Sequence, residues 1–518
     1  MSMPIREIKV EIPVKTPHWI AGHSLGSEDM RSAFSFLLRC AAVTFALCIA
    51  PYYSIRTWFA VLDPDVYWHI RTGDWIVAHH AVPRYAIFSQ HLGSQWIAYS
   101  WLFDLIVSRV LHRFGLVGLP AFLVCLQVLL SLTFLIAMRH FGRGFWWPWL
   151  VGVLGIGAFY VSPLISMQFT LFFFIIELWL IFETERQGND KLLFWTVPLL
   201  ALWANFHIQF TYGLFVLALY VGARITPVLA RKWLPGEVRE TSPATLLAVL
   251  AAAIAGTCIG PNWAYPYKVV FYYVLHSGQF QLVQEMLAMN FRRPAHYVEL
   301  VLLMAACYAV GHSRRQDLFR PALLLLTAVV SFRAQRDAWF VSIAAGFVLA
   351  EAVSQGYAQA AEPQREGRTR LAANYALALA VALCLLFGLA RHQGVNAQGL
   401  MRIISRVYPV GATQFVRNSH LPGPMYNSFD WGGFLIFNLR EQPVSIDGRG
   451  NAYGDELITR SANTLNAIGW QDDPDLSRAN LVLLQRSVPL ASALEGDPHY
   501  RLAYKDDIAV VFVREQDR

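Results

Sequence analysis

Charged residues are scarce in this sequence. Asp, Glu, Lys and Arg make up 15% of its 518 residues, whereas soluble globular chains have about 25%. Hydrophobic residues make up 56%, and the mean hydropathy is +0.39. This composition excludes an intrinsically disordered or collagen-like chain. It predicts a polytopic α-helical membrane protein.

Cysteine is also rare, and common catalytic signatures are missing. The six cysteines lie in apolar stretches, with no C-x-x-C and no Cys/His cluster, which argues against a disulfide framework or structural zinc. No G-x-x-x-x-G-K-[ST], G-x-S-x-G or H-E-x-x-H motif occurs, so ATPase, serine hydrolase and zinc-protease functions lack support.

The formal charge of +7 is unevenly distributed along the chain. Residues 392–518 carry 12 Lys+Arg and 14 Asp+Glu, and residues 1–391 carry 30 and 21. The basic excess therefore belongs to the membrane part, where it indicates topology and contact with anionic membrane lipids. No Lys/Arg stripe with interleaved aromatics occurs, so we expect no nucleic-acid partner.

About eleven segments have the character of transmembrane helices, which need about 20 apolar residues each. Two apolar runs are too long for one helix, and we expect breaks at Ser162-Pro163 and at Asn205-Phe206-His207. The expected spans are 33–53, 116–138, two within 145–182, two within 192–222, 243–260, 297–311, 318–332, 338–353 and 371–390.

Three regions follow from these spans: a cytoplasmic N-terminal leader (1–32), a transmembrane domain (33–391) and a small α/β extracytoplasmic domain (392–518). With the N-terminus in the cytoplasm, Lys and Arg concentrate on the cytoplasmic side. The long outer loops are then 54–115 and 261–296. In the tail, short apolar runs between turn residues predict strands at 424–428, 443–447, 480–485, 500–505 and 508–513, with helices at 456–468 and 489–494.

An acid pair follows the first span directly. Asp63 and Asp65 flank Pro64, and His69 and Arg71 come within the next six residues. Carboxylates at a membrane surface, against aromatic side chains, suit a general base or a site for a divalent metal, Mg²⁺ or Mn²⁺, held by Asp63 and Asp65. The alternatives are that the two carboxylates cap a helix and that His69 is structural.

Two distant segments reinforce one another. The first is the run D-x-D-x-x-W-H-I-R-T-G-D-W-I from Asp63. The second combines YNSFDWGGFLI at 426–436 with VSIDGR at 444–449 and Tyr453-Gly454, and a weaker third is LWANFH at 202–207. Together they resemble the GT-C membrane glycosyltransferases, in particular bacterial relatives of the protein mannosyltransferases and the aminoarabinose transferases.

The resemblance implies a GT-C-like fold and transfer, on the outer face, of a sugar linked to polyprenyl phosphate. It implies that Asp65 is the catalytic base, with Asp63 as its partner or a metal ligand, and that His69 positions the acceptor or phosphate. This sequence departs from the group at Tyr99-Ser100, where the group carries His-Glu. If that carboxylate contributes to catalysis, its role is missing or moved here.

The leaving lipid phosphate requires cations. Arg333 and Arg336 flank a short outer loop, where they either bind phosphate or form ordinary interfacial contacts, including an Arg336–Asp337 pair. Arg71, His207 and Lys268 are further candidates for binding phosphate or sugar, although His207 also sits at a helix break whose backbone needs partners. In the tail, Asp430, Asp447, Arg449 and Tyr453 either contribute to catalysis or form turns and a buried charge pair, and we expect the second. The alternative for the domain is that it covers the acceptor or binds glycan.

These observations predict a membrane glycosyltransferase, inverting by a single attack. Its partners would be a polyprenyl-phosphate sugar donor, membrane lipids and a glycan, lipid or protein acceptor. We expect it in a bacterial inner membrane with the C-terminal domain in the periplasm. The alternatives are a transporter or flippase of lipid-linked sugars and a non-catalytic protein of envelope glycan assembly.

Overall fold

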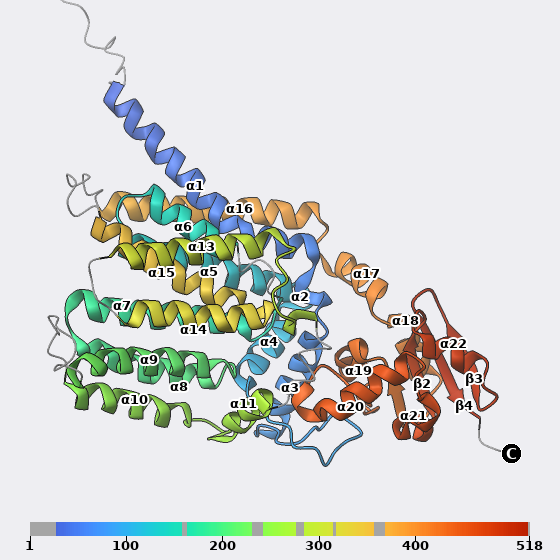
Figure 1. The fold of residues 1–518 in the computed structure, drawn as a ribbon. Coiled ribbons are helices and arrows are strands. Elements are labelled where there is room, and N and C mark those ends of the chain that lie inside the picture. The colour runs from blue at the N-terminus through green and yellow to red at the C-terminus, as the bar shows by residue number, and fades with distance from the viewer. Residues whose placement is uncertain are drawn as a thin grey trace, which may run out of the picture.

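The chain forms a bundle of long helices with a small unit containing a β-sheet at one end (Figure 1). This computed structural model describes residues 27–157, 163–229, 242–275, 284–313, 318–356 and 368–515. Residues 1–26 of the expected leader and Ser162 of the first expected break lie outside that part of the chain.

A helix forms at each of the expected spans. Six helical segments are long and apolar enough to cross a membrane, and α6, α9 and α10 are shorter apolar helices. By the length and apolar character of these helices, the chain is a membrane protein. The total of eleven crossings stays a prediction. The helices are α1 (Ser27–Thr57), α5 (Gly118–Phe141), α6 (Trp146–Ile156), α7 (Met167–Gln187), α8 (Thr196–Ala204), α9 (Phe210–Leu229), α10 (Pro243–Thr257), α13 (Pro294–His312), α14 (Phe319–Arg333), α15 (Ala338–Gly356) and α16 (Arg368–His392).

The break between α8 and α9 has a clear physical reason. The Asn205 side-chain amide donates to the Ala201 carbonyl (2.8 Å) and to the Ile259 carbonyl (2.7 Å), and its oxygen accepts from Trp101 Nε1 (2.8 Å). Backbone groups freed at a helix break inside a membrane need such partners. Asn205 therefore supplies partners to the backbone at this break.

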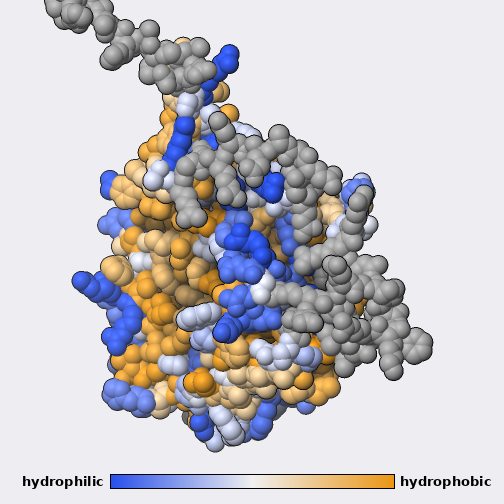
Figure 2. All heavy atoms as spheres, turned by 90° about the vertical axis from the view of Figure 1, so that its left-hand side faces the viewer, coloured by the Kyte–Doolittle hydropathy of each residue, from blue (hydrophilic) through white to orange (hydrophobic). Residues whose placement is uncertain are grey.

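The bundle end opposite the sheet is polar. Figure 2 shows hydrophilic residues across the middle of that end, between hydrophobic flanks. Arg320, at the start of α14, pairs there with Glu351 of α15 (2.6 Å) and Glu185 of α7 (2.8 Å). Charges at helix ends and apolar sides are the arrangement that a bilayer requires.

The two long loops that we expect on the outer face contain helices of their own, and we keep the names first outer loop for 54–115 and second outer loop for 261–296. Residues 54–115 form α2 (Phe59–Leu62), α3 (Asp65–His79) and α4 (Trp101–Phe114), and 261–296 form α11 (Tyr265–Leu275) and the short 3₁₀ helix η2 (Gln284–Met286). Helices α3 and α4 pack closely where Gly73 faces the Asp104 carbonyl. These segments lie at the end of the bundle that faces the C-terminal unit (Figure 1).

The C-terminal unit mixes helices and strands, as expected for an α/β domain. Its sheet has the order β1-β2-β4-β3, with β1 parallel to β2 and the other pairs antiparallel. The expected strand at 443–447 is reduced to Val444, which bridges Ser89 and Met425. The elements are α17 (Ala397–Val407), α18 (Val410–Asn418), β1 (Met425–Asn427), α19 (Gly432–Asn438), α20 (Gly450–Leu465), α21 (Pro474–Arg478), β2 (Leu481–Gln485), α22 (Pro489–Glu495), β3 (Tyr500–Lys505) and β4 (Ala509–Arg514).

We predict that Gly73→Val separates α3 from α4. A Cβ at Gly73 would overlap the Asp104 carbonyl oxygen and lie 2.6 Å from Ser108 Cβ. Such overpacking costs about 1–3 kcal/mol or more. Thermal unfolding of the purified protein in detergent should show the loss. Gly93→Val is the control, because nothing lies within 4 Å of a Cβ there, and equal stability of the two variants would contradict this packing.

Candidate active site

The acid pair, Asp63 and Asp65, lies at the junction of α2 and α3. The Asp65 backbone N–H donates to Asp63 Oδ1 (2.9 Å), so Asp63 caps the start of α3. Asp65 is the first residue of α3, and its Oδ1 accepts from Trp68 Nε1 (2.9 Å). The helix N-terminus and the indole N–H both favour a negative charge on Asp65.

The two carboxyl groups differ in their surroundings. Burial and the neighbouring Asp65 charge raise the pKa of Asp63 well above its ordinary value. Burial also raises the pKa of Asp65, but the Trp68 hydrogen bond and the charge of His69 act in the opposite direction. Surroundings that separate the pKa values of two neighbouring carboxyl groups in this way are typical of acid/base sites.

His69 links α3 to α4 through Asp104. Its Nδ1 lies 2.5 Å from Asp104 Oδ1, and both side chains are buried. The ring packs against Trp68, with centroids 3.6 Å apart, and Ser100 Oγ donates to the same Asp104 oxygen (3.4 Å). His69 therefore lies one helical turn after Asp65, and the Asp104 carboxylate fixes its ring. Many catalytic sites position a histidine in this way.

A turn of the C-terminal unit closes over the acid pair. We call Asp447-Gly448-Arg449 the closing turn. A Cβ at Gly448 would overlap Asp65 Oδ1, and a Cβ at Gly433 of α19 would overlap the Pro64 carbonyl oxygen. Glycine at these two positions is what lets the C-terminal unit approach the acid pair so closely.

The closing turn contains the buried charge pair that the sequence suggested. Arg449 donates through Nε and Nη2 to the two Asp447 oxygens (2.8 and 2.7 Å), and neither side chain is exposed (0% each). The Tyr453 hydroxyl also donates to Asp447. The guanidinium lies over Trp96 (4.6 Å) and Phe88 (5.3 Å) of the first outer loop. The pair therefore joins the C-terminal unit to that loop.

Arg336 is the candidate cation that the fold brings to the acid pair. It lies in the short 3₁₀ helix η3 (Gln335–Asp337) and pairs with Glu285 of η2 (2.9 Å). Burial raises the pKa of Tyr99 to about 12, and the nearby Arg336 charge acts against that rise. The Arg336 charge also acts on Asp63. The expected Arg336–Asp337 pairing is replaced by Gln209 and Tyr212, which donate to Asp337 (2.6 and 2.7 Å).

His207 is buried behind Tyr99. Its Nδ1 lies 2.9 Å from Thr170 Oγ1, which also accepts from Trp203 Nε1 (2.9 Å). The charges of Arg336 and His69 both act on His207, so these three side chains lie near one another. The structure therefore gathers Asp63, Asp65, His69, His207 and Arg336 in one region.

The other expected cations lie in different surroundings. Arg71 faces Asp74 (3.7 Å) and the Phe88 ring (5.5 Å), and Lys268 lies over the Tyr265 ring on α11 (5.0 Å). Arg333 is exposed at the end of α14. None of these contacts reaches the acid pair.

Two acidic residues of this region escaped the sequence reasoning. Asp104 lies on the helix that follows Tyr99-Ser100, so a carboxylate is present one turn beyond the position where the group carries His-Glu. Its only sequence signal was a lone acid in the apolar run from Trp101. Glu285 gave no signal, because only the fold brings the second outer loop to Arg336.

The described residues do not by themselves build a metal centre. They contain no group of three or more His, Cys, Asp or Glu side chains placed to hold an ion. The two carboxylates of the acid pair remain the expected ligands, and we assign no chemical step to a metal.

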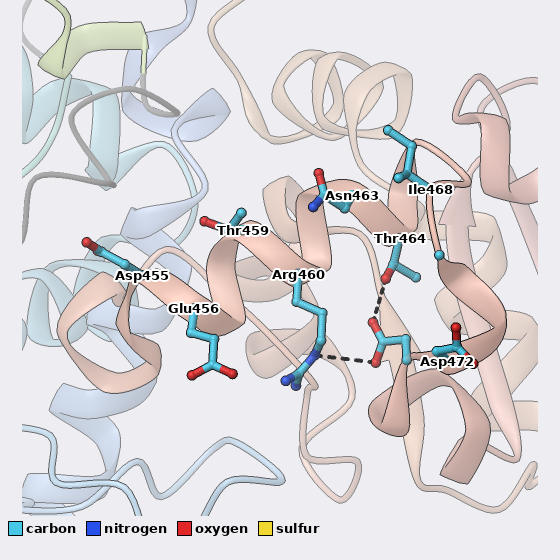
Figure 3. Close-up of a pocket in the computed structure, with 10 residues that line it drawn as sticks. Asp455, Glu456, Thr459, Arg460, Asn463, Thr464, Ile468 and Asp472 are labelled. Carbon is cyan, nitrogen blue, oxygen red and sulfur yellow. Dashed lines mark hydrogen bonds and ion pairs between the residues drawn. The ribbon is translucent and has the colours of Figure 1, made fainter.

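A pocket of about 620 Å³, lined mostly by residues of α20, lies in the C-terminal unit (Figure 3), and neither Asp63 nor Asp65 lines it. Its central charges are already matched within the unit: Arg460 faces Asp473 (3.7 Å), and Thr464 donates to Asp473 (2.6 Å). We assign it no role in catalysis.

Comparisons with known proteins identify the fold. No protein-family model matches the chain, and no curated protein sequence matches it. The oligosaccharyltransferase AglB from Archaeoglobus fulgidus, solved with an inhibitory peptide and a dolichol-phosphate, matches with a TM-score of 0.51, at 12% identity over 88% of this chain and 69% of AglB. The enzyme of the same organism tethered to an acceptor peptide with the NVT sequon gives 0.50, at 12% identity over 93% and 74%.

The fold is of the GT-C type. The resemblance drawn from the sequence motifs is thereby confirmed at the level of the fold. In this GT-C-type fold, the acid pair follows the first long helix and meets both the second outer loop and the closing turn.

We predict that Arg449→Met destabilises the outer end of the molecule by about 3–5 kcal/mol, because it leaves Asp447 buried without its partner. Thermal unfolding in detergent, with proteolysis of the C-terminal unit, measures the loss. The double variant Asp447→Leu/Arg449→Met leaves no uncompensated charge and should recover part of the stability. A double variant as unstable as the single one would show that the ion pair is not the cause.

Proposed function

We propose that this chain is an integral membrane glycosyltransferase that moves a sugar from a polyprenyl-phosphate-linked donor to an acceptor on the outer face. The observation that carries the proposal is the partly buried acid pair, fixed at the outer end of a GT-C-type bundle, with Arg336 beside it. The dolichol-phosphate bound to AglB supports a lipid phosphate as the leaving group.

Asp65 is the general base of the proposed reaction. The acceptor hydroxyl attacks the anomeric carbon and gives its proton to the Asp65 carboxylate. The new bond joins the acceptor oxygen to that carbon, while the bond from the carbon to the phosphate oxygen breaks and its electron pair stays on the polyprenyl phosphate. A single displacement of this kind inverts the anomeric configuration.

The neighbouring residues position this base. Trp68 N–H donates to one Asp65 oxygen, and the Gly448 backbone lies against the same oxygen. Asp63 fixes the backbone of Asp65, and the His69–Asp104 pair places a cation or a hydrogen-bond donor one turn away. Preorganised groups of this kind lower the barrier because they need not reorganise during the reaction.

Arg336 is proposed to bind the phosphate of the donor. Its planar donor fork matches a phosphate as well as a carboxylate. The lipid chain would lie in the bilayer beside the outer end of the bundle. The donor sugar and the acceptor, whether glycan, lipid or protein, follow from neither the site nor the fold. We place the protein in a bacterial inner membrane, with the C-terminal unit in the periplasm.

Asp65→Asn should lower transfer by about 10²- to 10⁴-fold, the usual contribution of a general base. The measurement compares envelope glycans and glycolipids by mass spectrometry in a deletion strain complemented with wild type or variant at matched expression. A species restored only by wild type supports the enzyme, and its mass identifies the sugar.

Asp74→Asn, on the same helix, is the matched control and should restore the species, because Asp74 pairs with Arg71 and His112 rather than with the acid pair. Full restoration by Asp65→Asn would mean that Asp65 is not the base. Transport or assembly would then explain the site better. Chelation with EDTA in an in-vitro assay tests the dependence on Mg²⁺ or Mn²⁺.

The pH profile should separate the two acids. A base must be ionised, so activity falls as pH drops through the pKa of Asp65, which burial raises above 3.8. Asp63→Asn should leave this acid limb in place, because burial and the Asp65 charge raise the pKa of Asp63 so far that Asp63 is already protonated where Asp65 titrates. Initial rates against pH for wild type, Asp63→Asn and Asp74→Asn measure it. A shift of the acid limb in Asp63→Asn alone would contradict this order of protonation.

A further inference from the structure

The Glu285–Arg336 ion pair is built into the outer end of the bundle. The segment after η2 is held against the end of α14 and η3 by backbone hydrogen bonds, from Met289 N–H to the Phe332 carbonyl (3.0 Å) and from Gln335 N–H to the Leu287 carbonyl (3.0 Å). These bonds place Glu285 Oε1 at 2.9 Å from Arg336 Nη1. The contact is therefore a product of the fold and not of two long side chains meeting on a free surface.

The two partners are not equally fixed. The Glu285 side chain is 49% exposed, whereas Arg336 is 20% exposed. Arg336 also has a buried Nε–H without a hydrogen-bond partner. The Arg336 guanidinium is thus largely enclosed, has one unused N–H donor and holds an exposed carboxylate. Another anion can replace that carboxylate on the planar donor fork of the guanidinium.

The other acids of the region do not compete for this fork. Asp337 accepts from Gln209 and Tyr212, and Asp63 accepts the Asp65 backbone N–H. Among the described residues, Glu285 makes the ion pair with Arg336. Because the Glu285 side chain is half exposed, its carboxylate regains water when it leaves the fork, so exchange of Glu285 for a phosphate meets little resistance.

We propose that Glu285 holds the place of the donor phosphate on Arg336, so that donor binding and product release are exchanges of one anion for another. This inference rests on the proposed function. The donor, a phosphodiester, displaces Glu285. The product is a phosphomonoester, whose second ionisation has a pKa near 6, so it carries more negative charge than the donor and binds Arg336 more strongly. Return of Glu285 to the fork opposes that binding and helps the product to leave.

The test measures binding of undecaprenyl phosphate to the full-length protein in detergent, by competition or native mass spectrometry. Glu285→Gln keeps the shape and removes the charge, so undecaprenyl phosphate should bind about two- to fivefold more tightly, the range expected for an exposed pair. Glu441→Gln, an exposed acid of the C-terminal unit, should leave binding unchanged. Inorganic phosphate in a parallel arm separates recognition of the phosphate from recognition of the lipid chain.

A double-variant cycle assigns the effect to Arg336. Arg336→Gln should weaken undecaprenyl phosphate binding, and Glu285→Gln should have no effect in that background. Arg336→Lys should recover part of the binding, which distinguishes lost recognition from lost folding. Weaker or unchanged binding in Glu285→Gln would overturn the inference, and weaker binding would make Glu285 a residue that orients Arg336.

The outcome is separable from that of the proposed function, because the binding assay requires no transfer. If Asp65→Asn retains full activity while Glu285→Gln binds undecaprenyl phosphate more tightly, the anion exchange stands and the assignment of the base falls. If transfer depends on Asp65 but Glu285→Gln does not bind more tightly, the exchange falls alone.

Discussion

The buried ion pair between Asp447 and Arg449 is the interaction on which the outer end of the molecule depends. Removing two charges from water costs several kcal/mol per ion, and contacts around the pair offset part of that cost. Here the contacts are the Tyr453 hydroxyl, the Arg449 backbone N–H (2.9 Å) and the faces of Trp96 and Phe88, while Arg449 Nη1 has no hydrogen-bond partner. Because the two rings belong to the first outer loop, they cover the guanidinium only when the C-terminal unit is docked.

Docking of the C-terminal unit has a direct consequence for the acid pair. Gly448 lies inside the same turn as the ion pair, so seating the guanidinium between the rings also sets the backbone against Asp65. The first outer loop holds Asp65 on a fixed helix pair, because Gly73 lets α3 pack on α4 and His69 of α3 bonds to Asp104 of α4. Segments far apart in sequence thus determine the position of one carboxylate.

The sequence predicted those parts of the architecture that depend on a continuous apolar run. It did not predict contacts between segments that are far apart in the chain. Long apolar runs define helices such as α5 and α16 without any tertiary information, and the turn at Asn205 was visible because polar residues interrupt an apolar run. Asp63 and Asp65 stood out because two acids follow a span. The sequence did not predict the pairing of Val444, because one of its two bridge partners is Ser89 of a distant loop. Glu285 was invisible for the same reason: its meaning depends on Arg336.

The charges around the acid pair make Asp63 and Asp65 differ in how readily each is ionised. Burial opposes ionisation of both groups, but only Asp65 has an indole N–H and a nearby histidine that favour its charged form. As pH falls, the first proton taken up by the pair is therefore held mainly near Asp63, and Asp65 stays ionised, as its proposed role as the base requires. Arg336 is paired with Glu285 in this structure. Under the proposed exchange, a singly charged phosphodiester in the place of Glu285 keeps one negative charge beside Arg336, so donor binding would leave the electrostatic surroundings of Asp65 nearly unchanged.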